Sequence, residues 1–103
     1  MYAVIFTATT AVLDDEYHST VAIMRDLAMT KYGCLDFVAL SDGMKEIAIS
    51  YWPNEQSIKH WKNDPQHWLA QHNGQDRWYD SYRVEVVEIK RVYTVPAKDW
   101  NLR

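Results

Sequence analysis

The sequence predicts an α+β fold in which strands and helices follow one another in the order β-α-β-β-α-β. Three observations lead to this prediction: alternating apolar residues near each end of the chain, a helical apolar stripe after the first strand, and a second helical region before the last strand. The 103 residues, 48% hydrophobic and 24% charged, suit one globular domain. We expect residues 1–95 to form this domain and residues 96–103 to form a tail.

The first strand is expected in residues 2–10, which carry apolar side chains on both faces and so predict a strand covered on both sides. Asp14 is a good N-cap for the helix that follows, because its carboxylate can accept N–H groups of the first turn. Gly33 is expected to end that helix in a left-handed conformation. The helix carries one apolar stripe, formed by Tyr17, Val21, Met24, Leu27 and Ala28.

The middle of the chain predicts a hairpin followed by two helices. Residues 34–41 and 46–52 are expected to be strands, and Asp42-Gly43 between them favours a tight turn, since glycine tolerates positive φ. Pro53 ends the second of these strands.

Two capping residues then predict where the helices begin. Asn54 caps a short helix, and Asp64 caps a longer one that starts at Pro65 and runs to about residue 79. Asn73-Gly74 weakens this second helix, and we expect a bend there.

The last strand is expected in residues 81–95, well beyond the usual 5–6 residues. Val84 and Val86 lie on one face and Val87 and Ile89 on the other, so either both faces are buried or a bulge lies near Val86. The element order is that of the ferredoxin-like fold, with a four-stranded antiparallel sheet. Because the helices cover only one face, we expect a homodimer, built through the sheet faces and the long last strand as a dimeric α/β barrel.

Charge and composition exclude several classes of partner and cofactor. The formal net charge is −3 without a run of like charges, so a nucleic acid is not an expected partner. No apolar run approaches roughly 18 residues and no Lys or Arg precedes Arg25, so neither a membrane span nor a secretory signal is expected. The single cysteine, Cys34, fits a reducing cytoplasm and is expected to be a small buried hydrophobe. No metal site is expected, since His60, His67 and His72 lack an i, i+4 pair, and the three glycines leave no phosphate-binding loop.

One stripe of the second helical region combines small residues with residues that form hydrogen bonds. His67, Ala70, Gln71, Gly74 and Trp78 stand at helical spacing and share one face. A dry core would use Leu, Ile and Val here, whereas small and polar side chains together are typical of a ligand pocket. The alternative is that Ala70 and Gly74 permit close packing on the sheet while His67 hydrogen-bonds a neighbour.

Aromatic side chains are expected to close this pocket. Trp61 lies one turn before the break at Asp64-Pro65 and could meet Tyr51 or Trp52 at the end of the third strand. His67 is the best candidate proton acceptor, because the pKa of histidine, about 6.5, suits a general base near neutrality.

Short motifs run through the same region: Ile49-Ser50-Tyr51-Trp52, Ser57-Ile58, Trp61-Lys62, His67, Ala70-Gln71, Gly74 and Trp78-Tyr79. With these motifs the chain resembles the antibiotic biosynthesis monooxygenase (ABM) family, over nearly its whole length. The family includes cofactor-free oxygenases of polyketide quinols, haem-degrading enzymes, quinol oxidases and proteins of unknown role. The resemblance implies a ferredoxin-like homodimer with a β-barrel interface.

The haem-degrading branch of the family implies three residues. It uses an Asn in the first strand, a Trp in the second helical region, and an axial His ten residues after that Trp. Trp61 matches the Trp, but Thr7 stands near the Asn position and Gln71 at the His position. A haem ligand would therefore have to be His72 or His67.

The cofactor-free branch is similar through its pocket of Trp and Tyr side chains. By this resemblance His67 would take a proton from the substrate, Trp61 Nε1 and Gln71 would donate hydrogen bonds to the oxyanion, and Tyr51 and Trp78 would form flat walls. The candidate catalytic residues are His67 and Trp61, and the candidate substrate-binding residues are Tyr51, Trp52, Gln71, Gly74 and Trp78.

Three functions are then open for the pocket. The first is a cofactor-independent monooxygenase that oxidises a small aromatic, quinol-like molecule with O₂. The second is a non-catalytic, dimeric binding or stress-related module that holds a small molecule. The third is haem binding, with or without degradation of the ring. Shared fold alone does not choose among them.

Overall fold

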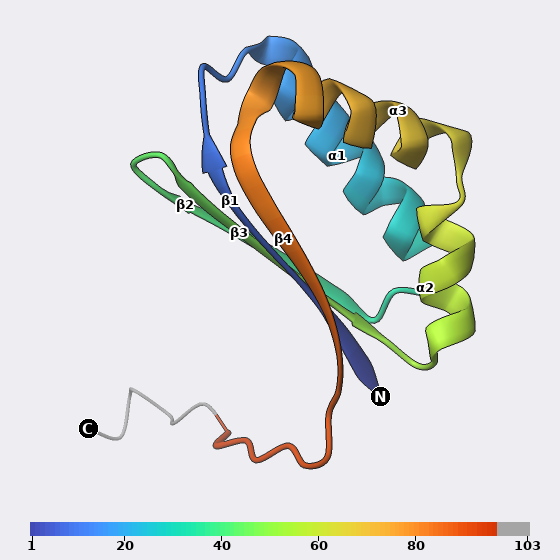
Figure 1. The fold of residues 1–103 in the computed structure, drawn as a ribbon. Coiled ribbons are helices and arrows are strands. Elements are labelled where there is room, and N and C mark those ends of the chain that lie inside the picture. Colours follow the sequence, from blue (N-terminus) through green and yellow to red (C-terminus); the bar gives the residue numbers. More distant parts are fainter. Residues whose placement is uncertain (97–103) are drawn as a thin grey trace, which may run out of the picture.

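A computed structural model describes residues 1–96 as a four-stranded antiparallel sheet with helices on one face (Figure 1). The strand order β2-β3-β1-β4 places β1 inside the sheet and β4 at its edge. This arrangement confirms the predicted ferredoxin-like α+β fold. Residues 97–103, which make up most of the predicted tail, lie outside the described residues. The strands are β1 (Tyr2–Thr10), β2 (Asp36–Asp42), β3 (Lys45–Trp52) and β4 (Tyr79–Glu88).

The helices begin where the sequence predicts. Asp14 Oδ1 accepts the N–H of Tyr17 at 2.8 Å, and Asn54 Oδ1 accepts the N–H of Ser57 at 2.8 Å. Gly33, just after the first helix, has φ +80°, the left-handed conformation that glycine adopts without strain. The helices of the described region are α1 (Asp15–Thr30), α2 (Glu55–Lys62), α3 (Pro65–Asn73) and the π-helix η1 (Gly74–Trp78).

The bend expected at Asn73-Gly74 is a change of helix type. The α-helix that begins at Pro65 ends at Asn73, and a wider π-helical turn follows, closed by the N–H of Tyr79 donating to the Gly74 carbonyl. Gly74 lies too close to the ring of Tyr79 for any other side chain to fit easily. The wider turn therefore ends at a position where a tyrosine ring packs directly on the backbone.

The last strand is shorter than predicted. β4 ends at Glu88 because its only neighbour is β1, whose first residue, Tyr2, pairs with Glu88. After one further hydrogen bond, from the N–H of Ile89 to the Met1 carbonyl, the segment up to residue 96 leaves the sheet (Figure 1). The register is regular at Val86, so the bulge is not there. The register shift lies at the other end of the pair, between Thr9 and Thr10.

The two faces of the sheet differ. The helix-covered face packs Val4, Phe37 and Trp52 against Met24 and Ile58 in the hydrophobic core. The other face carries no helix (Figure 1), and we call it the open face. Pairing and strand alternation place these apolar side chains on the open face: Ile5, Val38, Leu40, Ile47 and Ile49.

Two further expectations concern local features. Cys34 is buried in the core, as expected of a small hydrophobe. No helix within residues 1–96 is both long and apolar enough to span a membrane.

Candidate functional site

A cavity of about 200 Å³ lies between the helices and the covered face of the sheet. All four strands and helices α1, α2, α3 and η1 contribute to its walls, which are mostly apolar. Ligand sites are typically concave and mostly apolar, with a few polar groups that orient the ligand. The volume is below the 300–1,000 Å³ typical of sites for drug-sized molecules, and so suits a small ligand.

Four of the predicted site residues meet at this cavity. Trp61 from α2, His67 and Gln71 from α3, and Trp78 from η1 all line it. The amide Nε2 of Gln71 lies 3.5 Å from the hydroxyl of Tyr82, at the limit of a hydrogen bond, so it keeps donor capacity for a ligand.

His67 is the polar group of the cavity that most lacks a protein partner. Its Nδ1 is buried and has no hydrogen-bond partner among residues 1–96. Burial is the main cause that lowers the pKa of His67, and the nearby charge of Lys62 lowers it further. The imidazole is therefore neutral near pH 7 and can accept a proton. Its ring stands edge-on to Trp61, with 4.5 Å between ring centroids.

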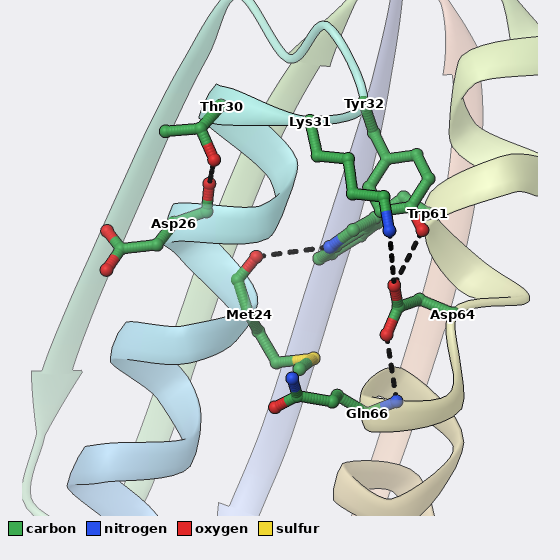
Figure 2. A network of polar contacts seen from close by, with 8 residues as sticks. All are labelled: Met24, Asp26, Thr30, Lys31, Tyr32, Trp61, Asp64 and Gln66. Carbon is green, nitrogen blue, oxygen red and sulfur yellow. Dashed lines mark hydrogen bonds and ion pairs between the residues drawn. The ribbon is translucent and has the colours of Figure 1, made fainter.

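A network of polar contacts holds the junction of α2 and α3 against the end of α1 (Figure 2). Asp64, whose side chain is 6% exposed, accepts the hydroxyl of Tyr32 at 2.6 Å and the N–H of Gln66 at 2.8 Å. Lys31 Nζ lies 3.9 Å from the same carboxylate. Because Asp64 is also the N-cap of α3, this network positions the first turn of that helix, which carries His67.

The indole N–H groups of two cavity tryptophans are already used inside the protein. Trp61 Nε1 donates to the Met24 carbonyl at 3.1 Å (Figure 2), and Trp78 Nε1 donates to Asp14 Oδ1 at 3.2 Å. The predicted role of Trp61 Nε1 as an oxyanion donor therefore does not fit this geometry. Trp61 and Trp78 contribute the flat surfaces of their rings instead.

Three predicted substrate-binding residues do not line the cavity. Tyr51 pairs with Ala3 and follows Ile49 on the open face, so the sheet separates it from the cavity. Trp52 is completely buried in the core, where its N–H donates to Ser50 Oγ. Gly74 acts through its missing side chain, because a Cβ there would lie 2.6 Å from the ring of Tyr79.

One polar cluster of the cavity was not predicted from the sequence. Glu46 on β3 lines the cavity together with Tyr17, Tyr79 and Tyr82. Tyr17 was expected only as a core residue of the α1 stripe. A signal was present at Glu46: it shares a strand face with Ala48 and Trp52, so a charged side chain stands where an apolar one is usual.

The two histidines expected as haem ligands lie in different surroundings. His72 is exposed and packs on Trp68 with 3.9 Å between ring centroids, so only His67 of the expected ligands reaches the cavity. Within residues 1–96, no group of three or more His, Cys, Asp or Glu side chains is arranged to hold a metal ion.

The chain is similar in sequence to a known bacterial protein. The chain is 36% identical over 92 residues to the uncharacterized protein YqjZ of Bacillus subtilis, a match that covers 87% of this chain and 80% of that protein. No protein-family model matches the sequence.

Solved structures with the same fold include ABM proteins. One is a variant of SnoaB, a cofactor-independent oxygenase from Streptomyces nogalater. It superposes on this chain with a TM-score of 0.74 and 11% identity, covering 88% of this chain and 94% of that chain. A candidate antibiotic biosynthesis monooxygenase from Deinococcus radiodurans has a TM-score of 0.73 and 14% identity, covering 94% of this chain and 100% of that chain. The match to these structures confirms the predicted resemblance.

Proposed function

Because the chain belongs to the family of YqjZ and has the fold of the antibiotic biosynthesis monooxygenases, we propose that it is a cofactor-independent monooxygenase of a small aromatic, quinol-like substrate. One observation carries this proposal: the Nδ1 of His67 is buried without a partner among residues 1–96, in a cavity lined by aromatic rings. A buried polar atom costs free energy unless a ligand satisfies it.

The proposed reaction needs only the substrate, O₂ and a base. His67 takes a proton from an electron-rich substrate, which leaves a carbanion or enolate. This anion passes one electron to O₂, and the substrate radical combines with superoxide to form a carbon–oxygen bond. The peroxide anion takes the proton back from His67, and loss of water leaves a ketone. One oxygen atom enters the product, the other leaves as water, and the substrate supplies all the electrons.

The surroundings of His67 support this sequence of steps. Its lowered pKa keeps the imidazole neutral and ready to accept the proton. The rings of Trp61 and Trp78 offer flat, apolar surfaces for an aromatic substrate, and Gln71 can donate a hydrogen bond to the developing anion. Most of the cavity wall is apolar, which strengthens the electrostatic interactions of the few polar groups that line it.

The test is oxygen consumption on a panel of hydroquinones and dihydroxynaphthalenes, with His67→Ala compared against wild type. We expect turnover to fall by about 10²–10⁴-fold, the usual contribution of a general base. His72→Ala is the matched control, because this exposed histidine lies on the same helix outside the cavity. In the wild type, turnover should fall with acidification only below the ordinary pKa of 6.5, because burial lowers the pKa of His67.

Two results would contradict the proposal. Unchanged turnover in His67→Ala, with normal folding by circular dichroism, would remove His67 from the mechanism. Stoichiometric binding of the panel compounds without any oxygen consumption would favour the binding module instead.

A further inference from the structure

A second polar group lies in the same cavity, away from His67. Glu46, 8% exposed, lines the cavity beside Tyr17 and Tyr79. The hydroxyl of Ser41, on the neighbouring strand β2, donates to Glu46 Oε2. Carboxylates are rarely buried, so a carboxylate in an apolar cavity calls for a specific role.

The two tyrosines beside Glu46 keep their protons at neutral pH. Tyr17 is 3% exposed, and its ring stands nearly perpendicular to that of Tyr79, with 6.0 Å between centroids. Burial is the main cause that raises the pKa of Tyr17, followed by its contacts with Tyr79 and Glu46. Burial likewise raises the pKa of Tyr79, and the charge of Glu46 adds to this, while Tyr17 opposes it. Both hydroxyls are therefore hydrogen-bond donors beside an acceptor.

The chain makes an unusual local structure to place Tyr79 there. The π-helix η1 immediately precedes Tyr79, and π-turns occur frequently at functional sites. Because Gly74 has no side chain, the ring of Tyr79 can pack on its backbone, where a Cβ would lie 2.6 Å from Cε2. Ordinary core packing requires neither a π-helix nor a glycine beneath the ring.

The two polar ends of the cavity are well separated. Glu46 lies near the start of β3, whereas Ser50, further along the same face, pairs with Phe37. The ring of Phe37 contacts Trp61, and Trp61 contacts His67. At about 3.3 Å per residue, the stretch of β3 from Glu46 to Ser50 spans about 13 Å. A ligand that hydrogen-bonds at both ends is therefore longer than a single aromatic ring, and a two-ring diol is the probe chosen for it.

We propose that Glu46 selects ligands with a hydrogen-bond donor at the end opposite the group that meets His67. A carboxylate only accepts hydrogen bonds and has about four lone-pair sites, so the hydrogen bond from Ser41 leaves sites for a ligand. The same negative charge repels a carboxylate or phosphate at that end. The preferred ligand is a two-ring aromatic diol, and the rejected one is the matching aromatic acid.

This inference rests on the proposed function, because it assumes that the cavity binds aromatic molecules. Its test is binding rather than turnover. Affinities for 2-naphthol, 2,6-dihydroxynaphthalene and 6-hydroxy-2-naphthoate are measured by calorimetry without oxygen. The wild type should prefer the diol over the naphthol by about tenfold, the contribution of a hydrogen bond to a charged group, and bind the naphthoate weakest.

Two variants change the proposed contact without removing a ring. Glu46→Gln keeps an acceptor for Ser41 but loses the charge, so affinity for the naphthoate should rise about tenfold while preference for the diol falls. Tyr79→Phe keeps the ring against Gly74 and should lower only the preference for the diol. Glu55→Gln, at the first residue of α2 and outside the cavity, is the matched control and should change nothing.

The outcomes separate this inference from the proposed function. Equal affinities for diol and naphthol, unchanged in Glu46→Gln, overturn the role of Glu46 even if oxygen consumption depends on His67. Selective binding of the diol with no oxygen consumption supports the role of Glu46 while contradicting the monooxygenase. Failure to bind any of the three compounds overturns the inference.

Discussion

At the scale of the residue, Gly74 is the position where the cavity depends most on a missing side chain. An alanine is normally favoured over glycine in a helix by about 1 kcal/mol. At Gly74, however, a Cβ would lie 2.6 Å from Cε2 and 2.8 Å from Cδ2 of Tyr79. Close packing leaves no room for that ring to move aside without disturbing its contacts with Phe6 and Tyr17.

We therefore expect Gly74→Ala to destabilise the protein by about 1–3 kcal/mol, the usual cost of overpacking, in spite of its gain in helix propensity. Urea unfolding measures this change. The control is the same substitution in a Tyr79→Ala background, where the ring is absent and the alanine should be neutral or stabilising. A loss of stability in both backgrounds would show that the backbone at Gly74, and not the ring, requires glycine.

At the scale of the element, one carboxylate joins two helices. Asp64 caps α3 and also accepts the hydroxyl of Tyr32, which follows α1 (Figure 2). The hydroxyl of Tyr32 is the main cause that lowers the pKa of Asp64, and the N–H of Gln66 adds to it. The folded state thus binds the proton of Asp64 less tightly than the unfolded chain.

Asp64→Ala should lower the urea midpoint at pH 7 by at least twice as much as Asn54→Ala. Each variant removes a capping hydrogen bond of 2.8 Å, but Asn54 caps only its own helix, whereas Asp64 also joins α3 to the end of α1. Since the pKa of Asp64 is lowered from its ordinary value of 3.8, its contribution is present above that pH and lost as pH falls through the lowered pKa. The difference in urea midpoint between Asp64→Ala and wild type should therefore become smaller as the pH falls through that lowered pKa. Equal effects of the two variants would mean that the contact with Tyr32 contributes nothing.

At the scale of the whole molecule, the open face of the sheet carries uncovered apolar side chains on β2 and β3, while β4 adds Arg83 and Glu85 to the same face. Leu40 is 69% exposed, Ile47 44% and Val38 43%. Contiguous exposed apolar surface of this kind commonly marks an interface with another protein. We propose that a second copy of the chain covers this face, sheet against sheet. The segment after β4 is not a strand, so a long last strand does not support this proposal.

Light scattering should then give a mass twice the 12.2 kDa of one chain. Ile49→Arg, near the centre of the open face beside Ile5, should convert the dimer to monomers, because the interface would bury an unpaired charge. Met29→Arg, at an exposed apolar residue on α1, should leave the dimer intact. A wild-type monomer at micromolar concentration would refute the proposal.

The parts of the fold that could be predicted from the sequence depend on neighbouring residues. Asp14 and Asn54 each cap a helix by binding an N–H three residues away, and Gly33 ends a helix through its own backbone angle. The length of β4 could not be predicted in this way. It depends on where β1 begins, since Tyr2 is the last partner available to Glu88.

For the candidate site, too, one part could be predicted from the sequence and another part could not. Helical spacing by itself determined that His67, Gln71 and Trp78 share a face. Only the tertiary structure decided that Tyr51 lies behind the sheet and that the indole N–H groups are occupied. Trp61 donates to Met24, 37 positions earlier, and Trp78 donates to Asp14, 64 positions earlier. Local periodicity carries no information about such distant partners, because they meet only when the helices pack on the sheet.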